Sequence, residues 1–184
     1  GKLETDMQDI FKDCHHIETL RLNNFKIDNE VSPPSDIEVS TETEFGDYRF
    51  EYFFDTLRNW ASNLKHIEMR NFNNPPITSM KGMFKYFTNV ETIDLDGAST
   101  ENITDMSEMF YNCRNLGELY LSSFNTSKVI TMENMFSDTE SLRQCDLRSF
   151  DYENVKTLSH LFYNSGIEQI PTSNYSSTNN VEDV

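Results

Sequence analysis

Apolar residues recur along this chain with a period of 26 residues. Between residues 77 and 170 the same pattern of methionine, phenylalanine and leucine is repeated four times, and whole columns of apolar positions keep this step. Two of the columns hold Met80, Met106, Met132 and Leu158, and Phe84, Phe110, Phe136 and Phe162. A fixed period in this range is typical of stacked repeat units, each of which buries its apolar face against its neighbours. The pattern therefore predicts a repeat protein.

Six units of the repeat can be followed. They begin near Thr5, Phe53, Ser79, Asp105, Thr131 and Thr157. Phe25 and Phe72 hold equivalent positions in the first two units but are 47 residues apart, one period and 21 more, so residues 29–49 are expected to form an inserted loop. This loop is acidic and contains two adjacent prolines, which indicates disorder, a loosely packed flap or a segment that contacts a partner. Residues 1–171 are thus assigned to the repeat domain, and residues 172–184 to a tail or a truncated next repeat.

The unit at residues 105–125 shows how each repeat is expected to fold. Asp105 suits a helix N-cap, and Glu108 three residues later completes a capping-box pattern. The following apolar positions have the spacing of one stripe on a helix of about two turns; they are Met106, Met109, Phe110 and Cys113. Leu119 and Leu121 then alternate with outward positions, which predicts a short strand.

These elements predict an α/β fold. It is a right-handed solenoid like that of the leucine-rich repeats, with six short strand-plus-helix units and one continuous parallel sheet. The methionine and phenylalanine columns are interpreted as core ladders rather than as a cofactor-binding box, so Phe110 is expected to be wholly buried between Phe84 and Phe136.

Charge and cysteine content limit the possible partners. The formal net charge is −16, which argues against nucleic acid because its binding depends on Lys and Arg at the phosphates. No apolar run approaches the roughly 18 residues of a membrane span, so no direct membrane insertion of this sequence is expected. The chain begins without a signal-peptide pattern, and any export signal or anchor would lie outside it. The three cysteines occupy apolar columns and are interpreted as buried thiols, with a disulfide as the alternative.

The polar residues of the predicted strands form the candidate binding site. They alternate with the apolar residues, so stacking should gather them on one exposed, concave face. This hypothetical site comprises Arg21, Glu68, Arg70, Asp94, Asp96, Glu118, Tyr120, Asp146 and Arg148. A central tyrosine among charges resembles an interaction hot spot. Alternatively, the charges are ordinary cross-strand pairs that keep the sheet soluble, such as Arg21 with Glu68 and Arg70 with Asp96.

No motif supports an enzyme. The start of a calcium loop at residues 94–97 lacks the later ligands and is interpreted as a solvated strand edge. The four histidines are not spaced as metal ligands with Cys or carboxylates, and no hydrolase, nucleotide-binding or metalloprotease motif occurs. We therefore expect no catalytic residues, no metal and no cofactor.

Two segments carry a resemblance to a known family. ITDMSEMFYNCRNLGELYLSSFNTSKV and VITMENMFSDTESLRQCDLRSFDYENV resemble the 26-residue repeat of the BspA-type leucine-rich-repeat proteins, which are bacterial and protist surface proteins. The resemblance implies a non-catalytic module, at the cell surface or secreted, for recognition or adhesion. It implies a protein or glycan partner, such as one of the host matrix or of a cell surface. The alternatives are a structural stalk or spacer in a longer repeat array, and an intracellular scaffold or effector.

Overall fold

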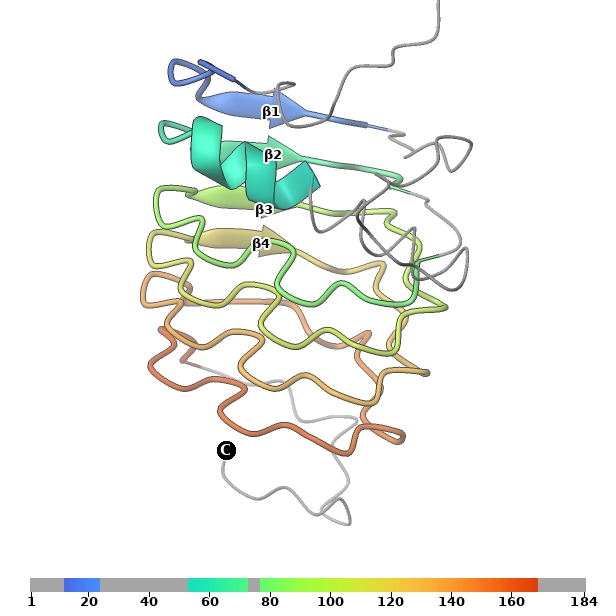
Figure 1. Ribbon diagram of the computed structural model, residues 1–184. Coiled ribbons are helices and arrows are strands. Elements are labelled where there is room, and N and C mark those ends of the chain that lie inside the picture. The colour runs from blue at the N-terminus through green and yellow to red at the C-terminus, as the bar shows by residue number, and fades with distance from the viewer. Residues whose placement is uncertain (1–11, 24–52, 73–76, 169–184) are drawn as a thin grey trace, which may run out of the picture.

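The computed structural model describes residues 12–23, 53–72 and 77–168 of the chain. Within these residues lie four strands: β1 (Thr19–Arg21), β2 (His66–Glu68), β3 (Thr92–Asp94) and β4 (Glu118–Tyr120). All neighbouring strands are parallel and follow one another in the order β1-β2-β3-β4, as Figure 1 shows. The prediction of one parallel sheet is confirmed.

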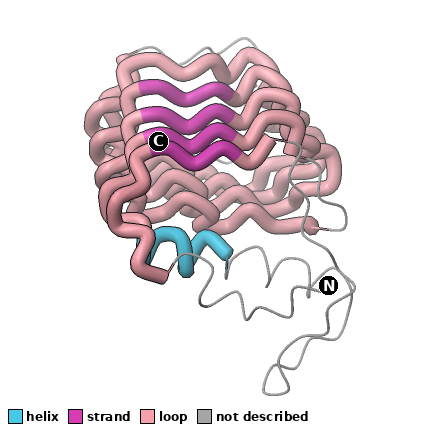
Figure 2. The backbone as a smooth tube through the Cα atoms, turned by 90° about the horizontal axis from the view of Figure 1, so that it is seen from above, coloured by secondary structure: helices cyan, strands magenta, loops and turns pink. Residues whose placement is uncertain are grey.

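The strand register follows the sequence period. His66 pairs with Thr92 and Thr92 with Glu118, each 26 residues on. Thr19 pairs with His66, so β1 and β2 are direct neighbours although 47 residues separate them. Seen along the stack, successive units lie over one another and the strands share one side, as Figure 2 shows. The predicted inserted loop at residues 29–49 and the tail at residues 172–184 lie outside the described residues.

The prediction of a helix in every unit is wrong. In the described part of the chain only residues 53–60 are helical. Elsewhere turns replace the helix, and their alternate N–H groups donate to the next unit. In the unit at Asp105 these donors are Met106, Glu108, Phe110 and Asn112, whose acceptors are the carbonyls of Thr131, Glu133, Met135 and Ser137 at 2.8–3.0 Å. In an α-helix the same N–H groups would instead donate to carbonyls four residues earlier, within the same unit.

Residues with left-handed backbone explain the loss of these helices. Glu108 and Asn112 have φ values of 57° and 59°, a conformation that interrupts a right-handed helix. The equivalent pairs in the other units are Gly82 and Tyr86, Asn134 and Asp138, and His160 and Asn164. In the second unit the first of these positions is Thr56, whose β-branched side chain resists positive φ, and there the helix forms. Asp105 also makes no capping box: its Oδ1 accepts from the N–H and hydroxyl of Ser107, at 2.8 and 2.6 Å.

The prediction of a strand in every unit is also incomplete. Residues 131–168 contain no strand, although parallel bridges join Ser79, Asp105, Thr131 and Thr157 on the turn side of the stack. In the unit at Thr131, Asp146 Oδ1 accepts the N–H of Arg148 at 3.1 Å. The same contact, from the Asp96 N–H to Asp94 Oδ1 at 3.1 Å, occurs at the end of β3, so it does not explain the missing strand.

Phenylalanine rings form the axis of the core. Phe110 is fully buried and lies 5.6 Å, nearly parallel, from both Phe84 and Phe136, as predicted. Phe136 continues the stack onto Phe162 at 5.5 Å. In the second unit the phenylalanine column holds Arg58 instead of Phe. There Phe54 of the helix packs edge-on against Phe84, with the ring centroids 4.9 Å apart. The three cysteines are free; Cys113 and Cys145 are buried and Cys14 is half-buried.

Candidate functional site

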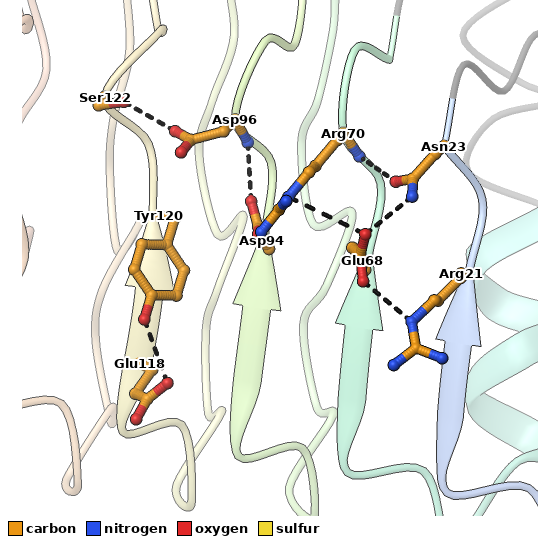
Figure 3. A network of polar contacts seen from close by, with 9 residues as sticks. All are labelled: Arg21, Asn23, Glu68, Arg70, Asp94, Asp96, Glu118, Tyr120 and Ser122. Carbon is orange, nitrogen blue, oxygen red and sulfur yellow. Dashed lines mark hydrogen bonds and ion pairs between the residues drawn. The ribbon is translucent and has the colours of Figure 1, made fainter.

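The outward side chains of β1 and β2 form the first part of the strand face, the name used here for the polar side chains on and just after the strands. Arg21 Nε donates to Glu68 Oε2 at 3.0 Å, which confirms the expected Arg21–Glu68 pair. Asn23 donates to the other Glu68 oxygen at 2.7 Å and accepts the N–H of Arg70 at 2.9 Å. Figure 3 shows these contacts crossing from β1 to β2. Side-chain hydrogen bonds thus link β1 to β2 in addition to their backbone hydrogen bonds.

Arg70 connects β2 to β3. Its guanidinium lies 2.6 Å from Asp94 and 3.9 Å from Glu68, so it spans two carboxylates on adjacent strands. The expected partner of Arg70 was Asp96, and the structure corrects this pairing to Asp94. Asp94 is only 7% exposed and Arg70 neutralises it, so it is not the solvated strand edge expected from the sequence. Arg70 is therefore already occupied by the protein's own acids.

The middle of the strand face differs from this ion-paired part. Tyr120 is 45% exposed, and its hydroxyl donates to Glu118 Oε2 at 3.2 Å. Asp96 accepts the hydroxyl of Ser122 at 2.7 Å. Among the described residues neither Glu118 nor Asp96 forms an ion pair. Figure 3 shows Tyr120 between Glu118 and the pair of Asp96 and Ser122.

Asp146 and Arg148 form the last predicted part of the site. Two nitrogens of the Arg148 guanidinium contact both oxygens of Asp146, at 2.9 and 2.7 Å. The hydrogen bonds from Arg148 lower the pKa of Asp146 to about 2. This pair lies within one unit, where no strand forms.

Comparison with known proteins gives one match. The model of the family described as "Mycoplasma protein of unknown function, DUF285" matches residues 78–184, more than half of the chain. The chain belongs to this family. No curated protein and no solved structure matches it. The DUF285 region contains β3 and β4, so Asp94, Asp96, Glu118 and Tyr120 lie within it, whereas Arg21, Glu68 and Arg70 precede it.

The electrostatic surroundings of the strand face differ between β2 and β4. Hydrogen bonds from Asn23 and then Arg21 lower the pKa of Glu68. In the DUF285 region the negative charge of Glu118 raises the pKa of Tyr120, and Asp94 and Asp96 act in the same direction. The surroundings of Tyr120 are therefore negative, while those of Glu68 are balanced by cations and amide donors.

The chemistry available on this surface is hydrogen bonding and charge pairing. Within residues 12–23, 53–72 and 77–168 no group of three His, Cys, Asp or Glu side chains could hold a metal ion. Burial raises the pKa of the Cys113 thiol to about 12, so this group stays protonated near neutral pH. No helix in the same ranges is long and apolar enough to cross a membrane.

Two residues that link the strand face were not among the predicted site residues. Asn23 and Ser122 bind Glu68 and Asp96 through short side-chain hydrogen bonds. Both occupy the column of Arg70, Asp96 and Arg148. That shared column is the signal that identifies them as members of the network.

Proposed function

We propose that this chain is a surface-exposed or secreted recognition or adhesion module that binds a protein or glycan through its strand face, without catalysis. In this proposal the chain is a right-handed solenoid of six units related to the BspA-type leucine-rich repeats. The 26-residue strand register and the match to a mycoplasma family support the proposal. Repeat proteins of this kind use their extended sheet surfaces for binding.

One observation favours the strand face as the binding surface. Tyr120 presents a 45% exposed side chain on β4, on the same face to which β1, β2 and β3 contribute polar side chains. Tyrosine is enriched at interaction hot spots because its ring is large and rigid while its hydroxyl forms hydrogen bonds. Both the ring and the acids beside it are available to a partner.

The test compares two exposed tyrosines. The protein is applied to immobilised extracellular-matrix proteins and glycans, and dissociation constants are measured for any that bind. Tyr120→Ala should weaken binding by about thirtyfold, the effect of a hot-spot residue. Tyr163→Ala is the matched control, because Tyr163 is 61% exposed but lies outside the strand face. Equal effects of the two substitutions would contradict binding through the strand face.

Location is tested separately. Protease treatment of intact cells that produce the full-length protein should remove this domain if it is displayed. A protected domain would favour the intracellular scaffold or effector. Display without any matrix or glycan ligand would favour the stalk or spacer.

A further inference from the structure

The ion pairs of the strand face are interrupted at its centre. Arg21 and Arg70 neutralise Glu68 and Asp94 on one side, and Arg148 neutralises Asp146 on the other. Between these arginines lie Asp96 and Glu118, whose carboxylates accept the hydroxyls of Ser122 and Tyr120 and form no ion pair with another described residue. In the column that supplies Arg70 and Arg148, the position beside Tyr120 is Ser122. Within the part of the chain that the structure describes, the centre of the face therefore has carboxylates and an aromatic ring but no cation of its own. Arg70 acts on Asp96 through its charge but is bound to Asp94.

We propose that a basic segment of a partner protein fills this gap, with an Arg or Lys side chain over the Tyr120 ring between Glu118 and Asp96. The inference rests on the proposed function and specifies its partner class. Arg70 spans Glu68 and Asp94, which are opposite each other in the strand register, whereas Glu118 is opposite Thr92 and Tyr120 is opposite Asp94. The partner's cation would therefore lie over the Tyr120 ring, with Glu118 on one side and Asp96 on the other, as these residues are arranged in Figure 3.

Three physical properties of the gap select a cation. A carboxylate has more acceptor sites than one hydroxyl can fill, so Glu118 and Asp96 can accept further N–H donors. An exposed tyrosine ring attracts cations through its negative face. The negative charge of Glu118, and to a smaller extent that of Asp94 and Asp96, raises the pKa of Tyr120, as expected for a ring in negative surroundings.

Charge also decides between a foreign partner and a second copy of this chain. At a net charge of −16, two copies repel each other, and the arginines of the strand face are already paired. The same net charge steers a basic partner toward the protein. A cationic partner is therefore the occupant that fits the whole molecule as well as the gap.

The experiment uses a short synthetic peptide of alternating Arg and Gly, with Gln or Glu in place of Arg as the control peptides. Dissociation constants are measured at physiological salt with the whole chain. The Arg peptide should bind, and the Gln and Glu peptides should not. Binding of all three, or of none, would overturn the proposal.

Matched double variants locate the binding. Glu118→Gln with Asp96→Asn should raise the dissociation constant by about tenfold, because hydrogen bonds to charged groups are roughly twice as strong as neutral ones. Glu133→Gln with Glu153→Gln removes the same charge from two exposed acids outside the strand face and should change the constant by less than about threefold, as expected for the general field alone. Equal weakening by both pairs would mean unspecific attraction to an acidic protein and would overturn the site.

Substitution of the ring gives an independent measurement. Tyr120→Ala should weaken peptide binding by about threefold or more, whereas Tyr120→Phe retains an aromatic face and should bind nearly as well as the natural chain. Perturbation of the Tyr120 ring resonances by the peptide in the unmodified protein checks the same contact without any substitution. An unperturbed ring would contradict the proposal.

Two outcomes separate this inference from the proposed function. A matrix or glycan ligand that depends on Tyr120, with no binding of the Arg peptide, would overturn the basic partner and leave recognition through the strand face intact. Self-association that is lost in the Glu118→Gln and Asp96→Asn variant would assign the gap to a second copy and also overturn the basic partner.

Discussion

At the scale of single residues, left-handed backbone positions determine the path of each turn segment. They recur four residues apart, as at Asn134 and Asp138, and several are Asn, Asp or Gly. Short polar side chains and glycine adopt positive φ at the lowest cost. This spacing is legible in the sequence, but it becomes informative only once turns are considered as an alternative to helices.

Gly97 should tolerate no side chain. Its φ is +78°, and an added Cβ would lie 2.3 Å from Asn71 Oδ1 and 3.2 Å from the Asn71 nitrogen. Gly97→Ala should lower the free energy of unfolding by more than about 1 kcal/mol, measured by urea denaturation. Gly117→Ala is the matched control, since its Cβ would meet nothing closer than 3.9 Å and its φ is not positive. A control as unstable as Gly97→Ala would refute the backbone explanation.

Phe110 should contribute more to stability than any residue of the strand face. It is fully buried between two parallel rings, so Phe110→Ala should lower the free energy of unfolding by about 3–5 kcal/mol. Tyr120→Ala, at an exposed position, should change it by no more than about 0.5 kcal/mol. Comparable denaturation midpoints for the two variants would contradict the assignment of Phe110 to the core.

At the scale of elements, the hydroxyls of buried threonines connect neighbouring units through pairs of hydrogen bonds. The Thr126 hydroxyl donates to the Asp151 carbonyl at 2.9 Å and accepts the Asp151 N–H at 2.7 Å. Thr100 makes the same pair of bonds with Asn125, at 3.0 and 2.8 Å. Each buried threonine thus provides both partners for the backbone of one residue in the next unit.

Thr126→Val should break this connection without changing the side-chain volume. Both backbone groups of Asp151 lose the partner that Thr126 supplies, and each unsatisfied buried polar group costs about 1–3 kcal/mol. The unfolding free energy should therefore fall by at least about 1 kcal/mol in urea titrations. Thr88→Val, at an exposed position, serves as the control and should be nearly neutral. No difference between the variants would show that water replaces the hydroxyl.

The elements also show why sequence reasoning succeeded on the strands and failed on the helices. In β4 and after it, Leu119 and Leu121 alternate with outward residues, a period that only an extended chain satisfies. The spacing of Met106, Met109 and Phe110 fits one face of a helix, but these residues are equally buried by a turn that bonds to its neighbour. Apolar periodicity cannot distinguish these two outcomes over about two turns. The pairing of Arg70 with Asp94 was likewise undetermined, because Asp94 and Asp96 are both within reach of a long arginine.

At the scale of the whole molecule, the stack continues across the 47-residue step between its first two strands. Thr19, Leu20 and Arg21 pair with His66, Ile67 and Glu68 as regularly as β2 pairs with β3. The step from β1 to β2 exceeds one period by 21 residues, the length assigned to the insertion at residues 29–49. The neighbouring strands do not depend on this extra length for their register.

Deletion of residues 29–49 should therefore leave a folded protein. The shortened chain restores the 26-residue step, and loop length changes stability by only about 0.6 kcal/mol per doubling. Its melting temperature should be close to that of the full chain, and circular dichroism should be unchanged apart from the missing residues. An unfolded product would mean that the segment contributes to the core. The described strands could not then form without it.

Bonds between units also constrain how the chain acquires its structure. Thr100 to Asn125, Gly97 to Ser123 and Lys128 to Asn102 join residues only 25 or 26 positions apart. Forming the contacts between any two adjacent units of regular length closes a loop of about the same size, so the entropic cost is similar for each pair. None of these contacts requires residues from a distant part of the sequence. Folding can start at any adjacent pair of regular units and spread in both directions, so the time to fold should depend little on how many units follow.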